Sequence, residues 1–303
     1  MLIESDVIDG LTQSPKLSNF RTPSSLSRWV DDRSLDVVLT NTATASALAR
    51  LRKPPVPVVY FCHGLHWARN AEWSPIWKSA ERLLLKHTTA AIVSNTEDED
   101  WFRARIGDAR VAKLPYGVGV PIERFPRTAT PPLDPRIRIA WIGDFSTRKQ
   151  PEAAVDVARH LKASGVDFQL TMAGSGPLMG RTATAISKYG LEDQITLPGR
   201  KDSGQLITNS HLLLHTSKWE GLARVLLEAV AIGRNTFGFD VKGVRDAPGI
   251  SVVESGQAEA LATAVRENIE AGLPPQGYPD PTAMTSATHA RLILGHLERW
   301  LDT

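Results

Sequence analysis

Continuous apolar runs alternate with amphipathic stretches along most of this chain, a pattern that few folds accommodate. After residue 133, the runs IRIAWIG and FQLTMAG flank the amphipathic stretch PEAAVDVARHLKASG, and HLLLHTS follows further on. Such runs are typical of strands buried on both faces, and strands that alternate with helices indicate a parallel sheet with helical crossovers. Pro151 and Gly165 stand where helices commonly begin and end. This half of the chain therefore predicts a doubly wound α/β lobe.

The first half of the chain repeats the alternation. The runs LDVVLT, VPVVYFC and AAIVSN predict strands, with helices predicted over 43–51 and 72–86 between them. Thr96 and Glu99 form a capping box, which predicts that a further helix begins there. Two α/β lobes of this kind predict a cleft between them, with the carboxyl ends of the strands facing it.

A proline-rich segment separates the two lobes. Five prolines lie from Gly119 to Pro135 among few apolar residues, which is the composition of a linker or an inter-domain crossing. We therefore assign residues 1–132 to an N-terminal domain and residues 133–303 to a C-terminal domain, and leave open whether the last helix crosses back.

Composition narrows the choice of partner and compartment. Lys and Arg number 35 against 33 Asp and Glu, a formal net charge of +2, which argues against nucleic acid as the partner and favours a small molecule. Cys62 is the only cysteine, so no internal disulfide forms and we expect the cytoplasm. No apolar run reaches the roughly 18 residues that a membrane span needs, so any membrane contact is expected to be peripheral. His63 and His66 are too few for a zinc site, and no metal is expected.

The stretch HTSKWEGLARVLLEAVAIG, residues 215–233, is the most informative. A buried strand leads into a loop with Gly221 and then into an apolar helix, whose first amides attract phosphate. Glu228 lies inside the helix, where its carboxylate is able to accept hydrogen bonds from ribose hydroxyls, and Glu220 precedes the helix and can face a sugar. By spacing alone, the two glutamates are better explained as an exposed helix charge (Glu228) and an acidic residue at the helix N-terminus (Glu220). The apolar neighbours of Glu228 favour the binding role.

Ser217-x-x-Glu220-Gly221, followed by Leu226-Leu227-Glu228-Ala229, resembles the signature of retaining glycosyltransferase family 4. Other landmarks of that family follow one another over about residues 20–270. They are the segments 62–67 (CHGLHW), Glu81, 95–98 (NTED), 116–120 (YGVGV), 141–150 (WIGDFSTRKQ), 172–177 (MAGSGP) and 197–200 (LPGR). Those in the first half resemble the branch that elongates lipid-linked oligosaccharides and makes capsular or exopolysaccharide repeat units.

The resemblance implies a GT-B fold, with two Rossmann-like lobes whose parallel sheets face a cleft, and an N-terminal lobe that is incomplete. It also implies transfer of a hexose or N-acetylhexosamine, with retention, from a nucleoside diphosphate sugar to a polyprenyl-linked saccharide. A UDP-sugar is the first candidate for the donor, and neither a metal nor another cofactor is implied. The donor is expected on the C-terminal lobe and the acceptor on the N-terminal lobe.

The resemblance assigns roles residue by residue. Glu220 and His63 contact the transferred sugar, and Lys149 contacts the diphosphate, so these three are the implied catalytic residues. Glu228 holds the ribose. The implied donor-binding residues are Glu228, Gly221, Leu222, Ala223, Arg148, Arg224, Arg200 and Arg245.

One departure from the family pattern supports a rival hypothesis. Asp144 stands where the family usually has an arginine, and Arg148 is either the substitute cation or a solvated loop residue. The rival is a catalytically impaired relative that acts as a binding or scaffold subunit of an active transferase. A sugar-nucleotide epimerase with the same fold is a third hypothesis, which the ordered landmarks disfavour. Without the resemblance, His63 is better explained by packing than by catalysis.

Two expectations concern surfaces. Family members open with a strand, a glycine-rich loop and a helix that this chain lacks, so the strand predicted over 35–40 is expected at an exposed edge. We expect either an upstream start, or self-association or a partner subunit that covers this edge.

On the helix predicted over 72–86, Lys78, Arg82 and Lys86 recur every fourth residue. This stripe predicts peripheral contact with the inner face of the plasma membrane, although an amphipathic helix packed on the sheet explains the pattern equally well.

Overall fold

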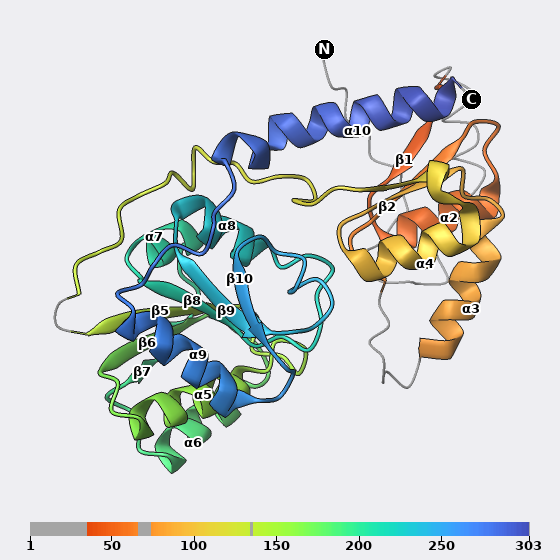
Figure 1. Ribbon diagram of the computed structural model, residues 1–303. Coiled ribbons are helices and arrows are strands. Elements are labelled where there is room, and N and C mark those ends of the chain that lie inside the picture. Colours follow the sequence, from red (N-terminus) through yellow and green to blue (C-terminus); the bar gives the residue numbers. More distant parts are fainter. Residues whose placement is uncertain (1–34, 66–73, 134–135, 303) are drawn as a thin grey trace. The chain divides into compact units, whose positions relative to one another are not determined.

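The computed structural model describes residues 35–65, 74–133 and 136–302 (Figure 1). The chain divides into two compact units. The first runs to Gly117 and takes in the chain from Arg291 onward, and the second is Val118–Ala290. Each unit is built on its own parallel sheet.

The first unit holds a four-stranded parallel sheet in the order β1-β2-β3-β4. The strands are β1 (Val38–Thr40), β2 (Val58–Cys62), β3 (Ala90–Val93) and β4 (Val111–Lys113). Its helices are α2 (Ala43–Arg52), α3 (Ser74–Leu85), α4 (Thr96–Ile106) and the short 3₁₀ helix η2 (Asp108–Arg110). Every residue of β2 and β3 is buried, as expected for apolar runs covered on both faces. Within the described residues β1 pairs with β2 alone, and the expected edge contact stays a prediction.

Helix α4 begins at Thr96 as predicted, but the capping residue is Asn95 and not Thr96. Asn95 has extended backbone angles, and its side-chain oxygen accepts a hydrogen bond from the Asp98 amide at 2.9 Å. Glu99 does not close a capping box but pairs with Arg103 at 2.8 Å and Lys113 at 3.2 Å. Asn95 is the capping residue because it lies one residue before Thr96, where the backbone is still extended.

The last helix, α10 (Ser286–Leu301), ends in the first unit. There the Trp300 indole donates a hydrogen bond to the Ala109 carbonyl at 2.8 Å. No helix within the described ranges has both the length and the apolar character required to cross a membrane.

The second unit is a six-stranded parallel sheet in the order β10-β9-β8-β5-β6-β7. Its strands are β5 (Ile137–Ile142), β6 (Phe168–Ala173), β7 (Ile195–Thr196), β8 (Leu212–His215), β9 (Asn235–Phe239) and β10 (Ile250–Val253). Its helices are α5 (Pro151–Ala163), α6 (Met179–Lys188), α7 (Ser203–Thr208), α8 (Arg224–Ile232), α9 (Ala258–Glu270) and the 3₁₀ helix η3 (Pro281–Met284). Figure 1 shows α5, α6 and α9 on one face of the sheet and α7 and α8 on the other.

The strand order reverses between β5 and β8, which are neighbours in the sheet. The chain leaves β5 toward β6 and β7 and then returns to β8 on the opposite side. At such a switch point the loops after the two strands diverge, and ligands of doubly wound folds bind in the crevice that results. Both units are thus Rossmann-like lobes, as the sequence predicts.

The proline-rich segment packs on the second unit, so the compact units divide at Gly117–Val118 and not at the expected 132/133 boundary. The Val120 amide donates to the Met284 carbonyl at 2.7 Å. Arg234, only 1% exposed, donates to the carbonyls of Thr128 and Ala129, both at 3.0 Å. A buried guanidinium that satisfies these carbonyls fixes a segment whose composition alone indicates a loose linker.

Candidate active site

The switch point brings three predicted site residues together. Glu220 lies in the loop after β8, and Arg148 and Lys149 lie in the loop after β5. Arg148 Nη1 is 2.5 Å from Glu220 Oε2, and Lys149 Nζ is 2.6 Å from Glu220 Oε1. The Glu220 side chain is 8% exposed and that of Lys149 is 13% exposed. The adjacency of β5 and β8 explains how residues so far apart in sequence form one ion cluster.

Glu220 is ionised in this cluster. Burial acts to raise its pKa, but the nearby polar ring of His215 and the charge and hydrogen bond of the Lys149 ammonium outweigh this and hold the pKa well below its usual range. Ser217 adds a hydroxyl that donates to Oε1 at 2.7 Å. The result is an anion matched to two cations, all placed at the carboxyl ends of the central strands.

The backbone of the Glu220 loop is held by the loop after β9. The Glu220 amide donates to the Lys242 carbonyl at 2.8 Å, and the Ala223 amide donates to the Gly243 carbonyl at 3.2 Å. Gly243 has a φ of +70°, and a Cβ there would lie 2.4 Å from the Glu220 carbonyl oxygen. Only glycine permits this approach. Gly243 was not predicted as a site residue from the sequence. The available signal was its position, because it is a glycine in the loop after β9, the strand next to β8.

A buried hydrogen-bond network holds the backbone of Lys149. Thr216 Oγ1 lies 3.0 Å from both the Lys149 and the Gln150 carbonyl oxygens and accepts from the Trp141 indole at 3.0 Å. Gln150 has a φ of 48°, a left-handed conformation that is uncommon outside glycine. It directly precedes Pro151, the first residue of α5. Thr216 and Trp141 therefore belong to the site. Both lie in segments that the sequence singled out, but neither was predicted as a site residue.

Glu228 lies within α8 and is partly buried, but it is not part of the Glu220 ion cluster. Burial raises its pKa, while a hydrogen bond with Ser203 and the positive charges of Arg224 and Arg124 act in the opposite direction. Burial destabilises the ionised form of this carboxylate, and a ligand that donates hydrogen bonds to it stabilises that form. Of the predicted cations, Arg224 is therefore the one near Glu228.

Gly221, Leu222 and Ala223 lead into the start of α8, where the structure gives no side-chain cap. Capping by a side chain is the usual way to satisfy the first amides of a helix, and an anion serves the same purpose. The position of these residues beside Glu220 is consistent with their predicted role.

Arg200 and Arg245 make contacts outside the Glu220 cluster. Arg200 Nε donates to Ser175 Oγ at 2.9 Å, which joins the loop after β7 to the Gly174 turn after β6. Arg245 Nε pairs with Asp240 at 2.5 Å. Asp144 is exposed, and its carbonyl accepts from the Ser146 amide at 2.8 Å. The donor-binding roles of Arg200 and Arg245 stay predictions.

His63 belongs to the first unit, where it follows β2. Its ring hydrogen-bonds with the Asn41 side chain and lies 4.3 Å, between centroids, from the ring of Phe61. His66 lies outside the described residues. In the part of the chain that the structure describes, no group of three or more His, Cys, Asp or Glu side chains is placed to hold a metal ion.

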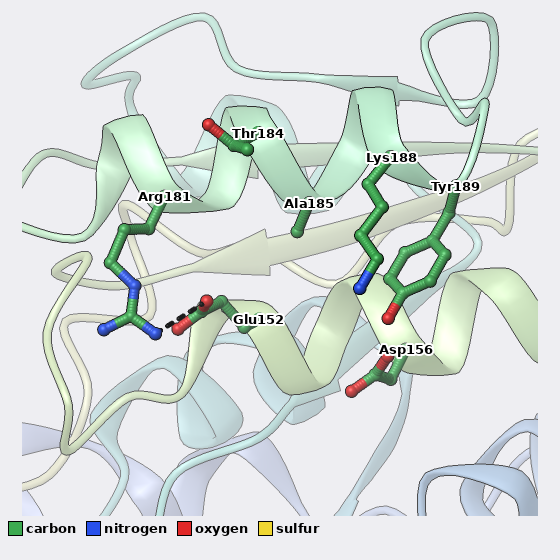
Figure 2. A pocket seen from close by; sticks show the side chains of 7 residues that line it. All are labelled: Glu152, Asp156, Arg181, Thr184, Ala185, Lys188 and Tyr189. Atoms are coloured by element: carbon green, nitrogen blue, oxygen red, sulfur yellow. Dashed lines mark hydrogen bonds and ion pairs between the residues drawn. The ribbon is translucent and has the colours of Figure 1, made fainter.

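A pocket of about 330 Å³ lies between α5 and α6, on a different part of the second unit (Figure 2). It is lined by Glu152, Asp156, Arg181, Thr184, Ala185, Lys188 and Tyr189. None of the predicted site residues lines it. Glu152 and Arg181 form an exposed ion pair across it at 3.2 Å, the kind of surface pair that contributes little to stability.

Two Rossmann-like lobes are the architecture of the GT-B class of proteins. The ion cluster lies at the switch point of the second lobe. Two family models match the chain: glycosyl transferases group 1 over residues 126–278 and a glycosyl transferase 4-like domain over residues 8–117. The first match spans slightly more than half of the chain, which belongs to the glycosyl transferases group 1 family.

Curated relatives support this assignment. The chain is 32% identical over 126 residues to the putative colanic acid biosynthesis glycosyltransferase WcaL of Escherichia coli, covering 38% of this chain and 31% of that protein. It is 28% identical over 207 residues to the putative glycosyltransferase EpsF of Bacillus subtilis, covering 63% and 53% respectively. The chain thus spans from about a third to about half the length of these relatives.

Solved structures share the fold. Anabaena HepE in complex with UDP superposes with a TM-score of 0.77 at 17% identity, covering 94% of this chain and 84% of that chain. Sucrose-phosphate synthase from Thermosynechococcus elongatus gives a TM-score of 0.76 at 19% identity, covering 97% and 82%. These likenesses confirm the predicted fold class.

Proposed function

We propose that this chain is a retaining glycosyltransferase that moves a hexose or N-acetylhexosamine from a UDP-sugar to a polyprenyl-linked saccharide in surface polysaccharide synthesis. The observation that carries the proposal is the ion cluster of Glu220, Arg148 and Lys149 at the switch point of a lobe of the glycosyl transferases group 1 family. Neither a metal nor another cofactor takes part in the proposed reaction.

The chemistry follows from the charges of the cluster. In the proposed transfer, the bond between the anomeric carbon and the diphosphate oxygen breaks, and the diphosphate leaves with the electron pair, so its negative charge grows. A hydroxyl oxygen of the acceptor forms the new bond to the anomeric carbon, and its proton passes to the departing diphosphate. Arg148 and Lys149 lie where they can stabilise this charge, and preorganised cations act most strongly on charge that develops in the transition state. Glu220 then contacts the sugar, Glu228 the ribose, and His63 the reacting sugar from the first unit.

The names of the relatives support the donor and the pathway. HepE was solved with UDP and with UDP-glucose. WcaL is described as a colanic acid biosynthesis enzyme, and AmsK of Erwinia amylovora as an amylovoran biosynthesis enzyme. We extend the corresponding substrate classes to this chain, together with a cytoplasmic location at the inner face of the plasma membrane. Self-association or a partner subunit that covers β1 is part of the same proposal.

A scaffold role is the second candidate, and Asp144 favours it because an exposed anion replaces the arginine expected beside the diphosphate. A thermal-shift screen of UDP-, GDP- and TDP-sugars, followed by a transfer and hydrolysis assay with the best binder, separates the two functions. Binding with turnover supports the transferase. Binding without turnover, or no binding, supports the scaffold.

Replacing Glu228 by alanine is expected to weaken nucleotide binding by about 1.5–3 kcal/mol, the range for hydrogen bonds to a charged partner. The measurement is titration calorimetry with UDP on the folded variant. Glu254→Ala is the matched control, because Glu254 is an exposed glutamate in the same unit. An affinity within twofold of the wild type would remove the ribose role from Glu228.

Helix α3 is expected to bind anionic membranes. Arg82, Leu83 and Lys86 are exposed, with Leu83 at 59%, and Lys78 is half-buried. Leu84 and Leu85 are buried and form part of the core face of the helix. Leu83 does not belong to that face, so packing on the sheet does not explain its apolar side chain. Trp73 and Trp77 are also four residues apart in the segment predicted as this helix, but Trp73 and the side chain of Trp77 lie outside the described residues.

The expected result is salt-sensitive binding to phosphatidylserine vesicles, which weakens when Lys78, Arg82 and Lys86 are all replaced by glutamine. Each basic residue near such a surface contributes about 1 kcal/mol. The control replaces Lys162, Arg181 and Lys188, on α5 and α6, by glutamine. Cosedimentation that responds to neither salt nor the α3 variant contradicts the membrane proposal.

A further inference from the structure

His215 lies close to the Glu220 carboxylate, and the family resemblance assigns it no role. It is the last residue of β8 and is 2% exposed. Its Nε2 lies 3.5 Å from Glu220 Oε1, which is too long for a well-formed hydrogen bond. Among the residues that the structure describes, this buried nitrogen has no hydrogen-bond partner. A buried polar atom without a partner is costly and requires an explanation.

The neighbouring charges define the state of the imidazole. Burial lowers the pKa of His215, and although Glu220 acts to raise it, Lys149 and Arg148 act in the same direction as burial, so the pKa stays below its usual value and the ring is neutral. An ionised carboxylate only accepts hydrogen bonds. The tautomer that carries its proton on Nε2 is therefore the favoured one, because it turns an N–H toward Glu220. His215 is a donor held just outside hydrogen-bond distance.

Glu220 needs such a donor when the site is occupied. Oε1 now accepts from Lys149 at 2.6 Å and from Ser217 at 2.7 Å, and Oε2 from Arg148 at 2.5 Å. If Lys149 and Arg148 turn to a diphosphate, the buried carboxylate keeps only the Ser217 hydroxyl among these three donors. A buried charge that loses its partners is strongly unfavourable.

We propose that His215 is a positioning residue that takes over from Lys149 as hydrogen-bond donor to Glu220 when Lys149 binds the donor diphosphate. The exchange keeps the Glu220 carboxylate paired and in place while the cation is released. This inference rests on the proposed function for the identity of the ligand, but the exchange itself is a property of the ion cluster.

The first experiment tests the exchange without nucleotide. In protein labelled with ¹⁵N at its 8 histidines, the ring Nε2–H signal of His215 is identified by its loss in His215→Gln. In Lys149→Met, which has lost the competing donor, this signal is expected to move downfield by more than its linewidth. Adding UDP to the wild-type protein should move it in the same direction. An unchanged signal in Lys149→Met overturns the inference whatever the function of the protein.

The second experiment is kinetic. Gln places an amide N–H₂ where the imidazole has Nε2, whereas Phe keeps the size of the ring and removes the donor. Because the hydrogen bond forms in the ground-state complex and persists in the transition state, His215→Phe is expected to raise KM for the nucleotide sugar about tenfold or more with kcat little changed. His215→Gln should restore most of the affinity, which a purely structural role would not predict.

The outcomes separate the two ideas. A wild-type protein that neither binds nor transfers any nucleotide sugar refutes the proposed function, while the Lys149→Met spectrum still decides the exchange. Normal wild-type turnover with His215→Phe within threefold in KM, or with His215→Gln as impaired as His215→Phe, refutes the role of His215. If His215→Phe does not fold, the spectra of the wild-type protein and of Lys149→Met remain decisive.

Discussion

Lys149→Ala is expected to lower kcat by about 10²–10³-fold, the usual effect of removing one preorganised donor to a developing anion. Lys149 Nζ lies 2.6 Å from Glu220, and its backbone carbonyl is held by Thr216, so only the side chain has to turn from the carboxylate to the diphosphate when the ligand arrives. The charge on the leaving diphosphate grows toward the transition state, so the loss should appear mainly in kcat. The fold should survive, because Arg148 and Ser217 still bond to Glu220.

Steady-state kinetics with the nucleotide sugar that the wild-type protein uses will measure this effect. Lys188→Ala is the control, because Lys188 is an exposed lysine of the same unit on α6. A change confined to KM would mean that Lys149 binds substrate and transition state equally well, and the catalytic role would be withdrawn.

Gly174→Ala is expected to destabilise the second unit by about 3 kcal/mol or more, in the range that marks severe single substitutions. Gly174 has a φ of +149°, and a Cβ there would lie 1.9 Å from the Gly143 carbonyl oxygen. The obstacle is backbone at the end of β5, so relief requires that the turn after β6 or the loop that carries Lys149 moves. Activity should fall together with stability, because both depend on this contact.

Gly165→Ala provides the matched control. Gly165 also has a positive φ, +79°, but a Cβ there meets nothing within 4 Å. It should cost only the left-handed backbone penalty of about 1–2 kcal/mol. Urea unfolding of both variants decides the matter. Equal losses at the two positions would mean that backbone conformation, and not the close approach to Gly143, accounts for the need for glycine.

Elements with strong local signals are predicted well from the sequence. The apolar runs that became β2, β3, β5, β6 and β8 all lie at the predicted places, because strands buried on both faces need continuous apolar residues. The meeting of Lys149, Arg148 and Glu220 follows from the motifs together with the fold. These residues lie at the ends of strands that a doubly wound sheet places side by side.

Features that depend on distant partners could not be predicted in this way. Thr216 and Gly243 act through contacts with backbone atoms of other loops, which lie far from them in the sequence. The compact units divide earlier than composition indicates because Arg234, about a hundred residues further on, binds the carbonyls of the proline-rich segment. Arg245 forms an ion pair with Asp240, a carboxylate five residues away, and its role at the donor stays a prediction.

The pairing of Arg148 and Lys149 with an internal carboxylate has a consequence for selectivity. Two cations that share one anion carry a net charge of only one, so a small inorganic anion gains little by entering and must compete with Glu220 for both of them. A ligand that brings a diphosphate together with sugar hydroxyls replaces both interactions at once, giving the cations new anions and the carboxylate new donors. On the proposed function, Glu220 thus competes with ligands for Arg148 and Lys149. This competition weakens the binding of free phosphate in a cell more than the binding of a complete nucleotide sugar.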